Sequence, residues 1–280
     1  MAVKIIIDSA SDITAREALE MGITMLPMTI QFGDEEYRAG VDLSNRVFYE
    51  KLLSCKELPK TSMINEYRFE KAFKNATENG DEVIVILISS KLSGTYEAAK
   101  RASEGFGGKV FVLDSLSAAT GERLLCMHAL KLIQEGKTAG QVFDELEKVK
   151  GKLCIMAALE TLEYLKKGGR ISGAVAFVGG MLKIKPLVML VDGEVKMIGK
   201  AHGQKRASAL LNSIVKERGG IDFSMPHGVI WTGLDESVAT NYMKECKPFL
   251  GEREVSTYLI GSTIGTHVGP GVFGWAFFEN

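Results

Sequence analysis

The sequence is poor in the patterns that assign a chain to a class at once. Only four of its 280 residues are cysteines, and they stand singly as Cys55, Cys126, Cys154 and Cys246. No two of them have the spacing of metal ligands, and a chain of this length does not depend on disulfides for a stable core. We therefore expect free thiols and a cytoplasmic protein.

A surplus of charge of one sign is also absent. The chain has 34 Lys and Arg against 35 Asp and Glu, a formal net charge of −1. Binding to nucleic acid phosphates usually needs a basic surplus, so we expect no nucleic acid partner. The most apolar stretch, residues 174–191, is interrupted by Lys183, Lys185 and Pro186. The apolar run at the start is too short for a signal peptide, and we expect no stable membrane insertion.

Two kinds of cofactor signature are missing as well. The glycine patterns of dinucleotide-binding folds and P-loops do not occur. No cluster of His, Asp and Glu has the spacing of a metal site. We therefore expect neither a resident cofactor nor a metal.

The most informative feature that is present is the segment Val83–Tyr96, VIVILISSKLSGTY. An aliphatic run that is apolar on both faces suits the centre of a parallel sheet. A helix-like stretch follows, and the turn between them contains Ser93, Gly94 and Thr95. Such a turn lies at the carboxyl edge of the sheet, where open α/β folds bind ligands, and the unpaired N–H groups at a helix start attract anions. This loop is suited to an anionic head group.

The order of strands and helices predicts the fold. Strands at residues 4–8, 83–88 and 109–113 alternate with helices, which indicates right-handed βαβ units and a parallel sheet. The second half reads as hairpins mixed with helices, with a strong hairpin signal at Asp192-Gly193. We predict an α/β protein with a parallel-sheet N-terminal domain (residues 1–151), an α+β C-terminal domain (residues 152–280) and a ligand between them.

Three further groups of residues need an interpretation. Thr61-Ser62 lies in an irregular loop, and on its pattern alone it is a cap, with Ser62 placed to begin the next helix through Ala76. Arg170 follows a double glycine, on a turn that we expect to be exposed. It is either a cation favoured at a helix C-terminus or a group that binds phosphate or carboxylate. His267 stands in a glycine loop, residues 261–271, where glycines permit close approach of a ligand.

Together these segments resemble the DegV family of bacterial fatty-acid-binding proteins, over essentially the whole chain. The most specific marks are Asp8-Ser9, LSGTY (residues 92–96), LKKGGRIS (165–172), Lys185-Pro186 and GTHVGPG (265–271). The resemblance implies two domains with a long-chain fatty acid between them. It implies that Thr61 and Ser93 hold the carboxylate, that His267 lies near the head group, and that Arg170 serves a kinase reaction.

The expected fatty-acid-binding residues are therefore Thr61, Ser62, Ser93, Gly94, Thr95 and His267. One departure concerns Met63-Ile64-Asn65, where the family usually has Gln, Pro and Ser. The pocket wall or the chain preference is expected to differ there. The residues that line the acyl chain do not follow from the sequence: Met156, Met181 and Met189 are candidates, but core packing is the simpler interpretation for each.

The resemblance implies a binding subunit without a catalytic nucleophile. It would carry a fatty acid such as palmitate or oleate to a separate fatty acid kinase, which supplies ATP and metal, and serve lipid transport or phospholipid synthesis. The alternative is a serine hydrolase acting on an acyl ester through Ser93 and His267, with Asp8 as a possible acid. Against it, Lys91 stands where a nucleophile elbow has its first glycine. A phosphosugar or nucleotide enzyme is a third hypothesis, by analogy of fold alone.

Overall fold

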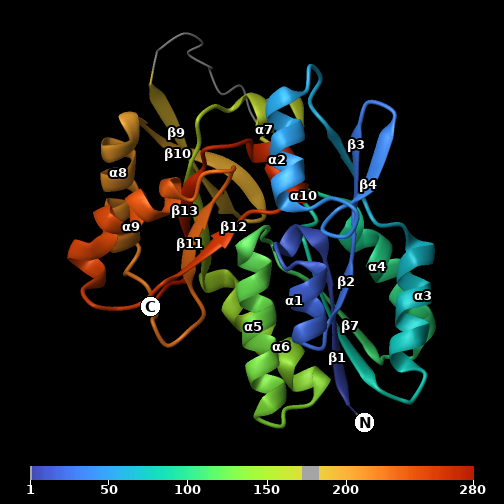
Figure 1. Ribbon diagram of the computed structural model, residues 1–280. Coiled ribbons are helices and arrows are strands. Elements are labelled where there is room, and N and C mark those ends of the chain that lie inside the picture. Colours follow the sequence, from blue (N-terminus) through green and yellow to red (C-terminus); the bar gives the residue numbers. More distant parts are fainter. Residues whose placement is uncertain (1, 172–182) are drawn as a thin grey trace.

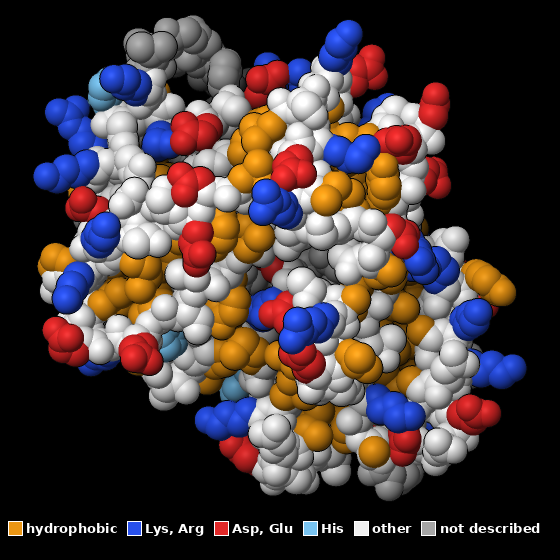
Figure 2. Space-filling model, in the orientation of Figure 1, with side chains coloured by type: hydrophobic (Ala, Val, Ile, Leu, Met, Phe, Trp, Pro, Cys, Tyr) orange, Lys and Arg blue, Asp and Glu red, His pale blue; other side chains and the backbone are white. Residues whose placement is uncertain are grey.

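The computed structural model describes residues 2–171 and 183–280 (Figure 1). Ser172, Met181 and residues 174–182 of the apolar stretch lie outside the described residues. Within the described ranges, no helix is both long and apolar enough to cross a bilayer. Basic and acidic side chains are interspersed over the face seen in Figure 2.

A four-stranded parallel sheet organises the first half, as predicted. In sheet order its strands are β2 (Thr24–Leu26), β1 (Val3–Asp8), β6 (Glu82–Leu87) and β7 (Val110–Asp114). β6 lies at the centre, and Val83–Leu87 are fully buried. An aliphatic run can be buried in this way because helices cover both faces of such a sheet.

The helices of this half are α1 (Ala15–Glu20), α3 (Glu66–Thr77), α4 (Thr95–Ser103), α5 (Thr120–Gln134) and α6 (Ala139–Val149), with 3₁₀ turns at Ser9–Ser11, Glu104–Phe106 and Lys150–Lys152. Figure 1 shows α3 and α4 to one side of the sheet and α5 and α6 to the other. Thr14 and Thr138 begin α1 and α6 with capping boxes, which satisfy the first free N–H groups of each helix. Neither Ser11 nor Asp12 caps α1.

A small antiparallel sheet stands beside the carboxyl edge of the parallel one. Its strands, in order, are β4 (Glu35–Arg38), β3 (Thr29–Phe32) and β5 (Lys60–Ser62), and α2 (Asn45–Ser54) follows β4 in the chain. The predicted loop at Thr61-Ser62 is therefore an edge strand. Ser62 does not cap α3. Asn65 does, because its backbone is extended and its side chain accepts a hydrogen bond from the N–H of Arg68.

A six-stranded mixed sheet organises the second half. In sheet order its strands are β10 (Glu194–His202), β9 (Ile184–Val191), β8 (Leu153–Ala158), β13 (Phe273–Phe278), β11 (Gly228–Trp231) and β12 (Ser256–Leu259). Only β11 and β12 are parallel, and β9 and β10 form the predicted hairpin. The remaining helices are α7 (Glu163–Lys167), α8 (Gly203–Glu217), α9 (Ser237–Leu250) and α10 (Ser262–Val268).

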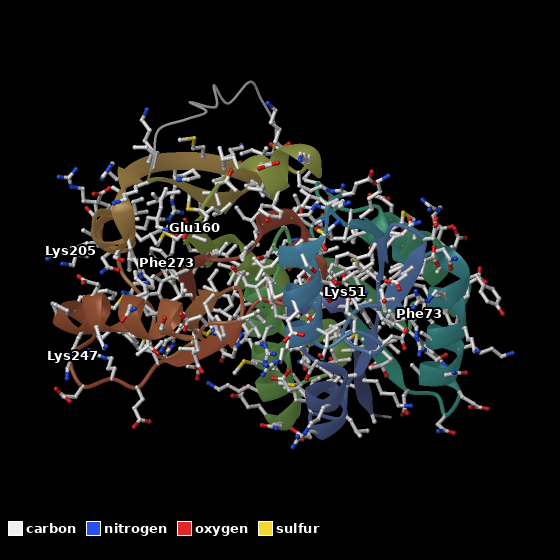
Figure 3. All side chains as sticks on the ribbon, turned by 45° about the horizontal axis from the view of Figure 1, so that its top comes forward. Lys51, Phe73, Glu160, Lys205, Lys247 and Phe273 are labelled. Atoms are coloured by element: carbon white, nitrogen blue, oxygen red, sulfur yellow. The ribbon has the colours of Figure 1, made fainter. Side chains whose placement is uncertain are left out.

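The two faces of the mixed sheet bury different cores. Along β8, Cys154 and Met156 join a cluster under α8 and α9, whereas Ile155 and Ala157 join the cluster that continues into the first half. This alternation is the period of two expected of a strand. Figure 3 shows Phe73 and Phe273 in separate halves of the molecule. Because one buried cluster contains residues of both halves, the division at residue 151 stays a prediction.

Candidate functional site

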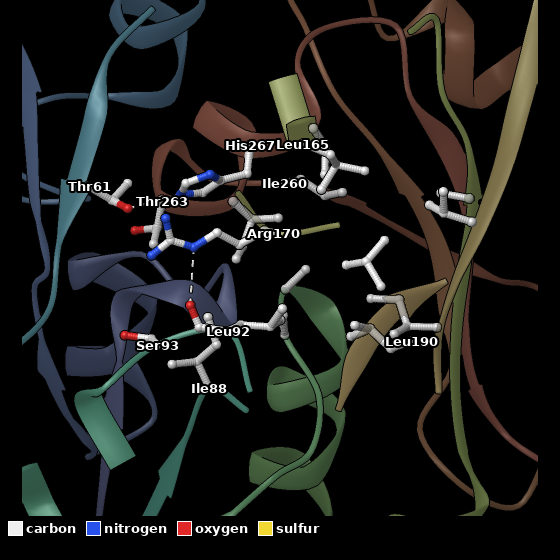
Figure 4. A pocket seen from close by; sticks show the side chains of 18 of the residues that line it. Thr61, Ile88, Leu92, Ser93, Leu165, Arg170, Leu190, Ile260, Thr263 and His267 are labelled. Atoms are coloured by element: carbon white, nitrogen blue, oxygen red, sulfur yellow. Dashed lines mark hydrogen bonds between the residues drawn. The ribbon is translucent and has the colours of Figure 1, made fainter. Parts of the chain in front are cut away.

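A cavity of about 400 Å³ lies where the two halves meet. Residues from both sides of position 151 line it, among them Thr61 and Ser93 from the first half and Ile155 and His267 from the second. Its size is within the range of sites for small molecules. Figure 4 shows polar side chains at one end of the cavity and apolar ones, such as Leu190, at the other.

The turn between β6 and α4 contributes to the polar end. Ser93 and Gly94 line the cavity. The Ser93 hydroxyl lies 2.9 Å from the Thr95 hydroxyl and accepts a hydrogen bond from the Thr95 N–H at 3.3 Å. Thr95 is completely buried and is not among the lining residues. Of the predicted turn residues, Ser93 and Gly94 thus face a ligand, and Thr95 supports Ser93 from behind.

Thr61 and His267 meet across the same end, although 206 residues separate them in the chain. The Thr61 Oγ1 and His267 Nε2 atoms are 2.9 Å apart. Burial, together with the positive charge of Arg170, lowers the pKa of His267 to about 4. The imidazole is therefore neutral at physiological pH. Ser62 lines the cavity from an exposed position beside Thr61.

Arg170 is half-buried and lines the cavity, whereas Lys166, Lys167 and Gly169 of the turn before it are exposed, as expected. Its Nε donates to the Leu92 carbonyl at 3.2 Å, and its Nη1 donates to the Gly168 carbonyl at 2.6 Å. These two bonds hold the guanidinium between Ser93 and His267 (Figure 4). A cation in this position can attract an anionic head group.

The glycine loop that carries His267 is largely a helix, α10, which is a correction of the sequence interpretation. Close packing explains it. A Cβ on Gly265 would come within 2.8 Å of Phe48 and 2.7 Å of the Tyr49 hydroxyl, so only glycine lets α10 approach α2 this closely. At its start, the Gly261 N–H donates to Asp12 Oδ1 at 2.8 Å, and the Tyr49 hydroxyl donates to the Ile260 carbonyl.

Thr263 is a lining residue that the sequence analysis missed. It lies on α10, and its hydroxyl is 2.9 Å from that of Ser9, which follows β1. Its position in the glycine-rich segment, residues 261–271, could have marked Thr263, but the sequence analysis considered only the histidine there. The Asp8-Ser9 end of β1 thus contributes indirectly. Asp8 accepts hydrogen bonds from the N–H groups of Ala10 and Ile88, and burial raises its pKa to about 6.

The three residues that depart from the family pattern all have structural roles. Met63 lines the cavity, and a Cβ on Gly94 would lie 2.8 Å from its sulfur. Ile64 is fully buried, and Asn65 caps α3. Of these three residues, only Met63 lines the cavity, so the expected difference in the pocket wall would come from this apolar side chain.

The far end of the cavity is apolar. Its wall includes side chains from the inner face of the mixed sheet, namely Ile155, Ala157, Val188, Leu190 and Ile230. Met156 and Met189 border the cavity, but both belong to the core on the opposite face of the sheet. Met156 and Met189 thus pack in that core and also line the cavity, so both interpretations hold for these two residues.

The polar end does not form the pair that a serine hydrolase needs. The Ser93 hydroxyl bonds to Thr95, and His267 bonds to Thr61. Both carboxylate oxygens of Asp8 accept backbone N–H groups. In residues 2–171 and 183–280, no group of three or more His, Cys, Asp or Glu side chains is arranged to hold a metal ion.

The whole chain matches a family of known proteins. Residues 2–280 fit the family model described as "Uncharacterised protein, DegV family". The chain belongs to the DegV family. A DegV domain-containing protein of Deinococcus radiodurans is 33% identical over 280 residues, which cover 99% of this chain and 98% of that protein.

Solved structures confirm the fold. A DegV family protein from Thermus thermophilus, described for its fatty acid binding, has a TM-score of 0.88 and 29% identity, with 100% of both chains covered. DegV from Bacillus subtilis, described as a fatty acid binding protein, has a TM-score of 0.86 and 26% identity, again with 100% of both chains covered. Fatty acid binding is therefore found within the DegV family.

Proposed function

We propose that this protein binds a long-chain fatty acid in the cavity between its two halves. The carboxylate lies among Thr61, Ser93, Arg170 and His267, and the acyl chain extends along the inner face of the mixed sheet. The observation that carries the proposal is the division of a single cavity into a polar and an apolar end. The fatty acid binding of the Thermus thermophilus and Bacillus subtilis relatives supports it.

The energetics favour a lipid over a small polar metabolite. Each buried methylene contributes about 0.8 kcal/mol, so a long acyl chain contributes on the order of ten kcal/mol. A hydrogen bond to a charged group adds about 1.5–3 kcal/mol. A buried carboxylate must be paired or hydrogen-bonded, and two hydroxyls with a guanidinium meet that need.

We further propose that the bound carboxylate is presented to a separate fatty acid kinase, which forms the acyl phosphate for phospholipid synthesis or lipid transport. Arg170 is the residue proposed for this step, since its planar fork of donors suits phosphate oxygens. It lines the head-group end of the cavity, where a transferred phosphate would stand.

Calorimetric titration of the delipidated protein with palmitate and with oleate tests binding. We expect saturable uptake of about one fatty acid per chain, and no uptake of short carboxylates such as acetate. Addition of a bacterial fatty acid kinase catalytic subunit and ATP, with trapping of acyl phosphate by hydroxylamine, tests presentation. Binding without turnover would leave a lipid carrier and reject the kinase partnership.

The hydrolase alternative predicts covalent labelling of Ser93 by a serine-directed phosphonate probe. We expect no labelling, because the nearest partner of the Ser93 hydroxyl is another hydroxyl, that of Thr95, and not a base.

A further inference from the structure

The hairpin of β9 and β10 turns at Asp192 and Gly193, whose φ angles are +51° and +81°. Positive φ at both central residues is typical of the two-residue turns that join the strands of a hairpin. A turn this short leaves no slack, so the residues next to it are held in register. Leu190 and Val195 pair across the two strands there, and both line the cavity.

The tip of this hairpin, Asp192-Gly193, packs against the first half of the chain. Ser89, which is fully buried after the end of β6, donates from its hydroxyl to the Gly193 carbonyl at 2.8 Å. A Cβ on Gly193 would overlap the Ser89 hydroxyl and lie 3.1 Å from a methyl carbon of Leu116. Only glycine therefore lets the tip approach this closely. These contacts are made within the protein and fix the tip without a ligand.

Leu190 is the last inward-facing residue of β9 before the turn. Side chains alternate along a strand, and Val188 and Leu190 face the cavity whereas Val191 packs against the core on the opposite face. Figure 4 shows Leu190 at the end of the cavity away from Thr61. Past Leu190 and its partner Val195, the hairpin continues only into its tip. A ligand whose head group lies at Thr61 therefore meets this pair with its other end.

A wall in a fixed position limits the length of an acyl chain. Each methylene that is buried adds about fourfold to affinity, as long as the cavity has room for it. A chain that is too long must bend back or displace the wall, and either change overpacks a filled space. The tip of the hairpin resists displacement through its contact with Ser89. Affinity should then rise with chain length up to a maximum and fall beyond it.

We propose that the Leu190–Val195 pair is the stop for the methyl end of the bound acyl chain, and that the fixed tip of the hairpin sets the longest chain that this protein accepts. Both residues then determine specificity for chain length. The proposal rests on the proposed function for the identity of the ligand, a fatty acid. It goes beyond that function by assigning a maximum length to the apolar end.

The first test measures affinity along a series of saturated fatty acids, from decanoate to arachidate, by competition with a fluorescent fatty acid. We expect the wild-type protein to gain about fourfold per methylene up to a maximum, and to lose affinity for longer chains. A gain that continues through arachidate overturns the proposal, because no stop would then exist.

The second test moves the stop. Leu190→Ala removes side-chain carbons at the end of the cavity, and we expect the maximum to shift by about two methylenes toward longer chains. Leu190→Phe should shift it toward shorter ones. Val195→Ala should act as Leu190→Ala does, and thermal melting shows which variants fold. The control is Leu165→Ala, the same substitution elsewhere in the cavity wall, which should lower affinity for all lengths without moving the maximum. A maximum that stays in place in Leu190→Ala and Val195→Ala, or that shifts equally in Leu165→Ala, overturns the proposal.

The third test releases the tip. Ser89→Ala removes the hydrogen bond to Gly193, and we expect chains longer than the maximum to gain about fourfold in affinity while shorter chains keep theirs. Ser90→Ala, one residue along the turn, is the control and should keep the wild-type profile. Equal profiles of the two variants contradict the role of the tip. Failure of the wild-type protein to bind a fatty acid of any length overturns the proposed function instead, so the two failures are distinguishable.

Discussion

The two ends of the cavity are built in different ways. At the polar end, each candidate side chain already has a partner within the protein: Thr61 bonds to His267, Ser93 to Thr95, and Arg170 to two backbone carbonyls. At the apolar end, the wall comes from neighbouring strands of the mixed sheet and carries no polar side chain from β8 or β9. In the proposed complex, the polar end therefore sets the orientation of the ligand, and the apolar end is expected to supply most of the binding free energy.

The largest expected effect is on the pH dependence of stability, and it comes from Asp12, which helps to hold α10 at the polar end. Burial raises the pKa of Asp12 from 3.8 to about 7, and Asp12 accepts the Gly261 N–H at the start of α10. A raised folded-state pKa means that the folded protein binds more protons than the unfolded chain between about pH 4 and 7. This group's contribution to stability is thus lost as pH rises through that window, by up to about 1.4 kcal/mol per pH unit.

Asp12→Asn keeps an acceptor for Gly261 and removes the titration. We measure the free energy of unfolding in urea from pH 5 to 7.5. We expect the value of the variant minus that of the wild type to increase as pH rises. Parallel pH profiles of the two proteins would show that Asp12 does not titrate in this range.

At the apolar end, Leu190→Asp is expected to reduce fatty acid affinity by about 100-fold or more. A carboxylate beside the acyl chain loses water when the ligand binds and gains no partner, a cost of several kcal/mol. Val191→Asp is the matched control, since it puts the same charge one residue along β9 on the opposite face. Calorimetry beside thermal melting separates binding from stability. Equal losses in both variants would mean that the chain does not lie on this face.

Arg170→Ala tests the contribution of the guanidinium at the polar end. We expect about a tenfold loss of fatty acid affinity, because one charge-assisted hydrogen bond is worth about 1.5–3 kcal/mol and Arg170 is already bonded to the protein. Acyl phosphate formation with the kinase should fall further than affinity, and Arg170→Lys should restore it in part. Lys167→Ala, an exposed neighbour paired with Glu163, is the control. Parallel loss of affinity and turnover would remove the proposed kinase role.

The smallest effects are expected from the hydroxyls. Thr61→Val and Ser93→Ala should each weaken binding about three- to tenfold, in line with one hydrogen bond each. Ser62→Ala should cost less, because Ser62 is an exposed residue. Titration of the three variants with palmitate gives the order. A larger loss for Ser62 than for Ser93 would place the head group at the exposed side of the cavity near Ser62, and not at the turn that carries Ser93.

Local features of this site could be predicted from the sequence. Ser93 and Gly94 were found because a buried strand, a turn and a helix follow one another within Val83–Ser103. The hairpin at Asp192-Gly193 was found for the same reason, since its signal lies in two adjacent residues. Local patterns also made Arg170 and His267 candidates, but the roles of both residues and of Thr61 came from the family resemblance and stay predictions.

Features that depend on distant contacts could not be predicted. α10 has no apolar period that marks a helix, and it forms where Gly265 packs against Phe48 and Tyr49, more than 200 residues earlier. The orientation of Arg170 depends on the carbonyl of Leu92. Alternation along β8 shows which residues share a face of the sheet, but it does not show which face meets the first half. The side on which Met156 packs therefore could not be predicted.

The central claim is that the cavity holds a fatty acid, and the most direct test is mass spectrometry of the small molecules released when the purified protein is denatured. The account predicts long-chain fatty acids in near-stoichiometric amount, and their loss in Leu190→Asp but not in Val191→Asp. Release of only polar metabolites, or of no lipid even after incubation with palmitate and oleate, would contradict it.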